Sequence, residues 1–136
     1  MEMIISLDMT SSTPIYLQLR NQIVIGIGKG ELAAGERLPT VRQLANDAGV
    51  NTMTVNKAYQ ILKNEGFIET GRRKGASVCV APKPETAFQE KIESELELLS
   101  AEAAIKGIGK EDFLNLCDRM FSHMHPAPES NFSYWI

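Results

Sequence analysis

The chain has 136 residues, of which 43% are hydrophobic and 23% charged, a composition typical of globular proteins that excludes intrinsic disorder. With no apolar run near the ~18 residues of a membrane span, no signal peptide and two cysteines, we expect a cytoplasmic protein without a membrane partner or a disulfide framework. The net charge of -3 argues against a nucleic-acid partner, but residues 1–80 carry nine Lys or Arg against seven Asp or Glu, whereas residues 81–136 carry five against ten. The acidity belongs to the second part, and a basic surface on the first part is not excluded.

Two prolines separate these parts. Pro82 and Pro84 bracket a single residue, a pattern that ends a strand and prevents a helix. The residues before them alternate between helical and strand patterns, and the residues after them are helical and acidic. We therefore expect one region over residues 1–81 and a second over residues 82–136.

The first predicted elements are a short strand and a helix. An apolar run at residues 4–7 predicts the strand. Thr13 and Pro14 then have the pattern of an N-cap followed by proline in the first helical position, and Gly30 is expected to end the helix. Apolar residues that recur every four positions form the inward face of this helix: Ile15, Leu19, Ile23 and Ile27.

Two further helices follow at close spacing. Residues 40–43 fit a capping box that begins the first of them, and Gly49 stands where a glycine ends a helix. Asn51 or Thr52 caps the second, which ends at Gly66. Two helices joined by about four residues around a glycine are the signature of a helix-turn-helix, whose second helix can enter the major groove of DNA.

The outward side of the second helix carries amides, hydroxyls and one cation, and no acidic residue occurs from Gly49 to Lys63. Asn and Gln suit adenine, and Thr can donate to phosphate. Arg42 could reach a guanine edge or a phosphate, or instead pair with Asp47 or Glu36. The alternative for the helix itself is a polar face that contacts only solvent. The candidate DNA-contacting residues of this motif are Thr40, Arg42, Asn51, Thr52, Thr54, Asn56 and Lys57.

A β-hairpin is predicted over residues 67–80, because polar and apolar residues alternate towards its end. Its tip, residues 71–75, places three adjacent positive charges between two glycines. Beside a helix-turn-helix such a hairpin would act as a wing, although a charged tip can also be merely solvated. We expect the wing to meet phosphates or a minor groove through Arg72, Arg73 and Lys74.

Four stretches of the chain match a known pattern: PIYLQL at residues 14–19, GERLPTVRQLA at 35–45, VNTMTVNKAY at 50–59 and LKNEG at 62–66. Together they resemble the winged helix-turn-helix of the GntR family of bacterial transcription regulators, and the short remainder resembles its YtrA-type subfamily. The resemblance implies that the wing contacts DNA together with five of the helix-turn-helix candidates, which are Arg42, Asn51, Thr52, Thr54 and Asn56. The chain departs from the family at Thr52 and Asn56, where many members carry arginine, and at Arg73, where glycine is common.

Two amphipathic helices are predicted in the second region, separated by residues 107–109. Two such helices cannot bury their apolar faces alone, so they need a partner. We favour a second copy of the chain over packing on the winged region, because helix-turn-helix proteins read palindromic half-sites. The resemblance also implies a dimerisation unit. The candidate dimerisation residues are Phe88, Ile92, Leu96, Leu99, Phe113, Leu116, Met120 and Phe121.

We expect no cofactor and no metal. His123 and His125 lie near Cys117, but only one of their spacings suits a metal ion and no carboxylate cluster adjoins them. Histidines are also favourable at the end of a helix without any ligand. Cys79 and Cys117 are predicted to be small core residues rather than redox sensors.

The sequence as a whole predicts a mainly α protein with a small β wing. A winged helix-turn-helix over residues 1–81 precedes a two-helix dimerisation unit with an aromatic tail over residues 82–136. The predicted function is that of a homodimeric repressor that reads a palindromic operator in double-stranded DNA, without catalysis. An unknown small-molecule effector would have to bind at the dimer seam or between the two regions. The alternatives are a winged-helix module that binds a protein and, less favoured, a metal-responsive regulator.

Overall fold

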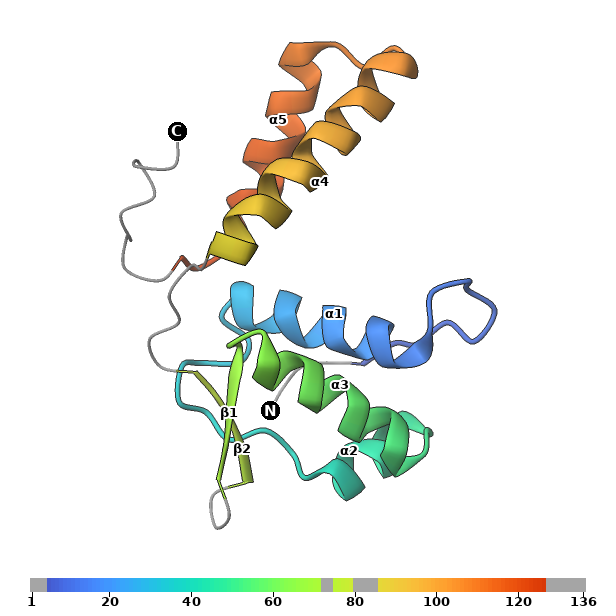
Figure 1. Cartoon of the computed structure of the whole chain (residues 1–136), viewed down its shortest axis with the longest axis vertical. Helices are drawn as coiled ribbons and strands as arrows, with labels where there is room; N and C mark the ends of the chain where they lie inside the picture. Colours follow the sequence, from blue (N-terminus) through green and yellow to red (C-terminus); the bar gives the residue numbers. More distant parts are fainter. Residues whose placement is uncertain (1–4, 72–74, 80–85, 127–136) are drawn as a thin grey trace. The chain divides into compact units, whose positions relative to one another are not determined.

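A computed structural model describes residues 5–71, 75–79 and 86–126 (Figure 1). The chain divides into two compact units, Met1–Pro82 and Lys83–Ile136. The mainly helical architecture with one small sheet confirms the predicted fold class. In chain order the elements are α1 (Ile15–Gly28), α2 (Val41–Ala48), α3 (Thr52–Asn64), β1 (Ile68–Gly71), β2 (Gly75–Val78), α4 (Thr86–Ile105) and α5 (Lys110–Phe121).

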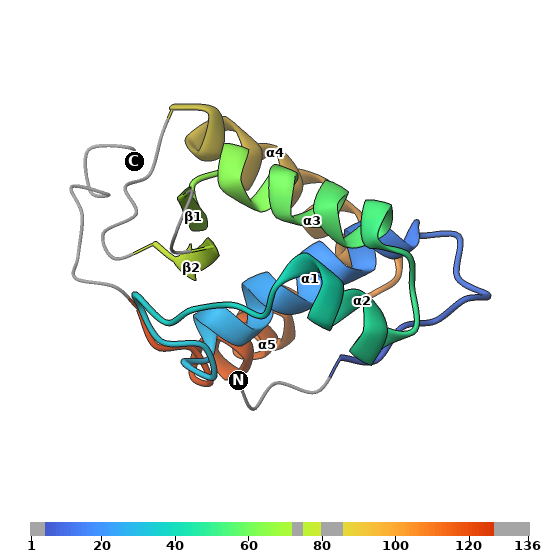
Figure 2. The same ribbon diagram turned by 90° about the horizontal axis from the view of Figure 1, so that it is seen from below.

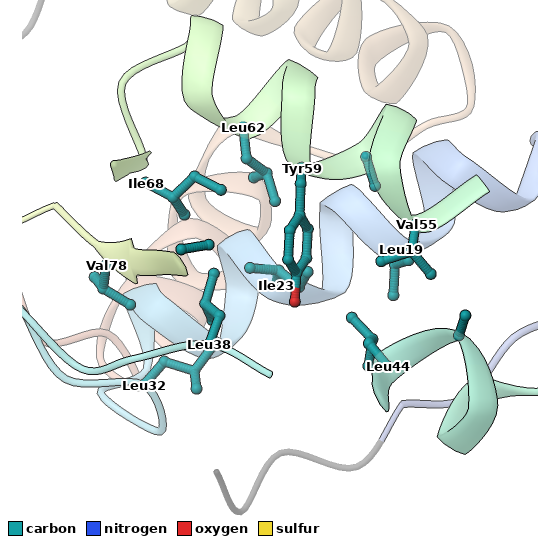
Figure 3. Packing of buried hydrophobic residues seen from close by; sticks show 13 residues of the cluster. Leu19, Ile23, Leu32, Leu38, Leu44, Val55, Tyr59, Leu62, Ile68 and Val78 are labelled. Carbon is teal, nitrogen blue, oxygen red and sulfur yellow. The ribbon is translucent and has the colours of Figure 1, made fainter. Parts of the chain in front are cut away.

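The third helix is the centre of the first unit. It packs against α1, against α2 near its N-terminal end and against β1 near its C-terminal end (Figures 1 and 2). Figure 3 shows side chains from all these elements converging on one apolar face of α3, with the ring of Tyr59 pointing into the cluster. That face consists of the buried residues Val55, Ala58, Tyr59 and Leu62.

Both ends of α2 are formed as the sequence predicts. The hydroxyl of Thr40 accepts a hydrogen bond from the backbone N–H of Gln43 at 3.1 Å, and the Gln43 side chain accepts from the Thr40 backbone N–H at 3.0 Å. Gly49 adopts φ +71° and donates its N–H to the carbonyl of Ala45. Because a side chain is strained in this left-handed conformation, glycine is required at the turn between α2 and α3.

The prediction for the start of α1 is wrong by one position. Pro14 is the N-cap, with ψ 147°, so the helix begins at Ile15 and Thr13 does not cap it. The carbonyl of Thr13 instead accepts a hydrogen bond from the Gln18 side chain at 2.8 Å. Gly30, at φ +79°, follows the helix end as expected.

The strand predicted at residues 4–7 is also wrong for its described part, because residues 5–8 have no strand partner. Side-chain amides of α1 take the place of a neighbouring strand. Gln22 bonds both the N–H and the carbonyl of Ser6, and Gln18 bonds both the N–H and the carbonyl of Asp8. The apolar side chains of this segment still pack against the core, and their residues are Ile5 and Leu7.

The hairpin forms as predicted, with β1 antiparallel to β2 and Ile68 opposite Val78. Its ladder ends at the pair Gly71 and Gly75. On its other side β2 is bonded to the segment before α2, since Leu38 donates to the carbonyl of Ala76 at 2.8 Å. The base of the hairpin is thus fixed to both α3 and the entry of α2.

The second unit is a pair of adjacent helices with little interior of its own. Gly107, at φ +86°, lies in the turn between α4 and α5. In α4 only Ala103 is buried, and no residue of α5 is buried. Among the described residues, no helix is long and apolar enough to cross a membrane.

Candidate nucleic-acid interface

The face of α3 opposite the core is polar and open to solvent. One large apolar side chain, Met53, also lies there and is 79% exposed. The buried face fixes the rotation of α3 about its axis, so the exposed set is determined by the core and not by local preference. The exposed polar residues at the start of the helix and along it are Asn51, Thr52, Asn56, Lys57, Gln60, Lys63 and Asn64.

Asn51 and Thr54 are engaged in the N-terminal cap of α3. The side-chain oxygen of Asn51 accepts from the backbone N–H of Thr54 at 2.8 Å and from its hydroxyl at 3.0 Å. A bidentate contact with adenine needs both the oxygen and the nitrogen of an amide. While the cap is intact, Asn51 can offer only its N–H groups, which suit a phosphate or a base acceptor.

Thr52 and Asn56 have exposed side chains without a hydrogen-bond partner in the described part of the chain. Asn56 therefore keeps both its donor and its acceptor for an external ligand. It is the residue of the predicted set that best fits a bidentate adenine contact.

Lys57 is held at the α1 side of this face. Its ammonium nitrogen lies 3.9 Å from the centroid of the Tyr16 ring. A cation over an aromatic face at an exposed site contributes about 0.5–1 kcal/mol, so this contact links α3 to the start of α1. The positions of Tyr16 and Lys57 in the sequence did not predict this contact.

The start of α2 borders the same surface. Because its oxygen accepts from Gln43, the Thr40 hydroxyl remains able to donate its proton. Arg42 is exposed and forms no ion pair with any residue that the structure describes. The sequence-based alternative, in which Arg42 pairs with Asp47 or Glu36, is therefore not observed.

A buried hydroxyl connects α3 to the entry of α2. The Tyr59 hydroxyl donates to the carbonyl of Pro39 at 2.8 Å. Burial raises the pKa of Tyr59 far above its ordinary value, so the hydroxyl stays protonated and remains a donor. At the other end of α3, Arg20 of α1 forms an ion pair with Glu65 at 2.9 Å.

The three predicted wing-tip residues, Arg72, Arg73 and Lys74, lie outside the described residues. Gly71 and Gly75, which flank them, close the ladder of the hairpin. The structure thus defines where the tip leaves the sheet, next to the C-terminal half of α3.

No group of three His, Cys, Asp or Glu side chains that could hold a metal ion occurs in the part of the chain that is described. Cys79 follows β2, is half-buried and contacts Glu69, with 3.5 Å between sulfur and oxygen. Cys117 is exposed. The prediction that both cysteines belong to a core is wrong for Cys117, because no described residue covers its side of α5.

The predicted dimerisation residues lie on α4 and α5, and only Ile92 and Phe113 among them are half-buried. Leu99, 53% exposed, contributes with three of the others to a largely apolar trough of about 510 Å³ between the two helices. Four exposed apolar residues were missed: Leu98, Ile105 and Leu114, which fall outside the three-and-four spacing of the helices, and Ile108, which lies in the turn between them. The lining of the trough is Leu99, Glu102, Ala103, Lys106, Ile108, Phe113, Leu116, Cys117 and Met120.

Residues 13–78 match the family described as "Bacterial regulatory proteins, gntR family". The repressor YtrA of Bacillus subtilis is 45% identical over 74 residues, covering 54% of this chain and 57% of YtrA. The regulator Rv1152 of Mycobacterium tuberculosis is 41% identical over 71 residues, covering 52% of this chain and 59% of the relative. The chain thus spans under two thirds of these two proteins. YhcF of Bacillus subtilis, an uncharacterized HTH-type transcriptional regulator, is 35% identical over 109 residues, covering 76% of this chain and 87% of YhcF.

Solved structures share the fold. A transcriptional antiterminator from Listeria monocytogenes matches with a TM-score of 0.80 at 25% identity, over 93% of this chain and 97% of that chain. YtrA from Sulfolobus acidocaldarius, a GntR-family transcription factor, matches with a TM-score of 0.58 at 40% identity, over 71% of this chain and 98% of that one. The DNA-binding domain of AraR in complex with operator ORX1 matches with a TM-score of 0.50 at 25% identity, over 54% of this chain and 92% of that one.

The Tyr59 hydroxyl provides a test of how α3 is fixed to α2. Tyr59→Phe should lower the free energy of unfolding by about 1 kcal/mol, because the Pro39 carbonyl loses its donor. Urea denaturation followed by circular dichroism measures this loss. Tyr16→Phe is the matched control, since the Tyr16 hydroxyl has no partner among the described residues and its ring is kept. Equal stability of the two variants would contradict the assignment.

Proposed function

The chain belongs to the GntR family of bacterial regulatory proteins, among its YtrA-type members, and on this premise we propose that it regulates transcription by binding double-stranded DNA at specific sequences. The observation that carries the proposal is the outer face of α3. That face is polar and free of carboxylates, and it is presented by a helix whose opposite face is buried against three other elements. A rigid, polar helix of this kind suits the major groove.

In the proposed complex, α3 reads bases and the surrounding residues contact phosphates. Asn56 reads a base, because its amide has no protein partner in the described residues. Arg42, Asn51 and Lys57 contact the DNA backbone, and the wing follows the same duplex. The operator complex of AraR supports this arrangement, since a domain with the same fold binds DNA there.

We further propose that the active form is a homodimer that represses from a palindromic operator. The second unit supports dimerisation, because its two helices leave a largely apolar trough that none of the described residues fills. A two-fold copy would cover the trough and place two α3 helices on half-sites one helical turn apart. Repression is proposed because the relative YtrA is named a repressor.

Selection of bound sites from random duplex DNA, followed by affinity measurements at increasing salt, tests the function as a whole. We expect a palindromic consensus and a steep linear fall of log K with log salt, because phosphate contacts release counterions. Binding that is absent or independent of salt would exclude the DNA-binding function. It would instead favour a winged-helix module that recognises a protein.

Two variants separate base reading from phosphate contact. Asn56→Ala should change the preference at one base pair of each half-site and cost about 1–3 kcal/mol on the preferred sequence. Arg72→Ala should weaken binding to all sequences by a similar factor. Fluorescence anisotropy with the selected operator and an unrelated duplex distinguishes the two patterns. If both variants behaved alike on both duplexes, the assigned roles would be wrong.

The dimer is tested by placing a charge in the trough of the full chain. Leu99→Asp should convert the dimer to a monomer in sedimentation velocity, since a carboxylate would be buried without a partner in the interface. Met9→Asp is the control, because Met9 is a comparably exposed apolar residue of the first unit. A wild-type monomer, or a Leu99→Asp dimer as stable as the control, would contradict the proposal.

A further inference from the structure

A hollow of about 360 Å³ lies in the first unit between the entry of α2, the middle and C-terminal half of α3 and the end of the hairpin ladder nearest its tip. It adjoins the outer face of α3, since Asn56 and Gln60 belong to both. The sequence analysis did not predict a hollow at this place. Its lining is Pro39, Thr40, Val41, Asn56, Tyr59, Gln60, Lys63, Thr70, Gly71, Gly75 and Ala76.

The chemistry of the lining suits an anion with several oxygen atoms. Among the described residues of the lining, hydroxyls and side-chain amides supply neutral donors, Lys63 is the one charged residue, and no carboxylate occurs. Lys63 is exposed and has no ion-pair partner within the described residues. An ammonium and neighbouring neutral donors are the groups that proteins use for phosphate oxygens.

The hairpin side of the hollow includes two glycines, which lie beside Thr70 and Ala76. Gly71 and Gly75 face each other as the last pair of the ladder and both line the hollow. Gly75 adopts φ +65°, and no described atom lies within 4 Å of the place where its Cβ would be. A ligand can therefore approach the strands more closely here than at residues that carry a side chain.

The position of the hollow identifies the source of the anion. In duplex DNA a sugar-phosphate strand separates the major groove from the minor groove. If α3 occupies the major groove and the wing follows the duplex beside it, that strand must pass between α3 and the hairpin, where the hollow lies. We propose that the hollow seats a phosphate of this strand, with Lys63 as its ionic contact and Gln60 and Thr70 as neutral donors. This inference rests on the proposed DNA-binding function.

Gln60 keeps one N–H group available for this role. Its amide nitrogen donates to the side-chain oxygen of Asn64 at 3.2 Å, which occupies one of its two N–H groups. The other N–H remains for the phosphate. Thr70 lies on β1 and Gln60 on α3, so the two donors come from different elements that line the hollow.

The test is the salt dependence of DNA binding by the full-length variant Lys63→Gln. Its affinity should fall by the same factor for the selected operator and for an unrelated duplex, with base preference unchanged. The slope of log K against log salt should decrease by about one, because one phosphate contact is lost. Lys63→Arg should restore the slope, which a purely structural role of the lysine stem would not require.

Lys29→Gln is the matched control, since Lys29 is an exposed lysine that follows α1 and does not line the hollow. Its slope should equal that of the wild type. A Lys63→Gln slope equal to that of the control would overturn the inference while leaving DNA binding intact. A wild type without salt-dependent binding would overturn the proposed function and this inference together.

A free anion is the other source of the same chemistry, and inorganic phosphate tests it. Phosphate stabilises proteins relative to chloride without a binding site, so at matched ionic strength we expect the difference in melting temperature between the two salts to be the same for the wild type and for Lys63→Gln. Stabilisation by phosphate that disappears in Lys63→Gln, with an unchanged DNA slope, would make the hollow a site for a free anion and overturn the proposal.

Discussion

The arrangement of the first unit depends on the burial of one face of α3. Val55, Ala58, Tyr59 and Leu62 are covered by α1, α2 and the hairpin together. Since successive residues of an α-helix are about 100° apart, a slip of one residue would turn this face out of the core. Burying an aliphatic or aromatic side chain contributes about 1.5–3 kcal/mol, so such a slip would cost several times that amount. The same constraint decides which residues of α3 face outward.

The parts of the fold that follow from short-range rules were predictable. The capping box at Thr40 and the left-handed Gly49 involve residues three or four positions apart, and both appear in the structure. The strand at residues 4–7 was wrong because the apolar pattern was real but the backbone found side-chain partners, Gln18 and Gln22, instead of a strand. Thr13 was wrong because Pro14 takes an extended conformation that delays the helix by one residue. A hydropathy pattern contains no information on such partners.

The candidate site likewise has features that could be predicted from the sequence and features that could not. Its members could be predicted, because polarity and helical spacing identify the outer face of α3. Their chemical state could not, because it depends on bonds to other residues. The side-chain oxygen of Asn51 accepts the hydrogen bonds of the cap, and the ammonium of Lys57 lies over the ring of Tyr16 in α1. In the second unit the apolar stripes of α4 and α5 could also be predicted from the sequence. The pattern of these stripes does not identify what covers them.

The cap at the start of α3 has a consequence for how such a protein could change its target. Asn51 and Thr54 stabilise the helix and also border the proposed DNA surface, so a substitution there would alter folding and recognition at once, at about 1 kcal/mol for the lost cap. Thr52 and Asn56 are exposed and bonded to no described residue, and substitutions at such positions usually change stability by less than about 0.5 kcal/mol. New sequence preferences can therefore arise at these two positions without compensating mutations elsewhere. Substitutions in α3 are thus constrained by stability at the cap residues Asn51 and Thr54, and much less so at Thr52 and Asn56.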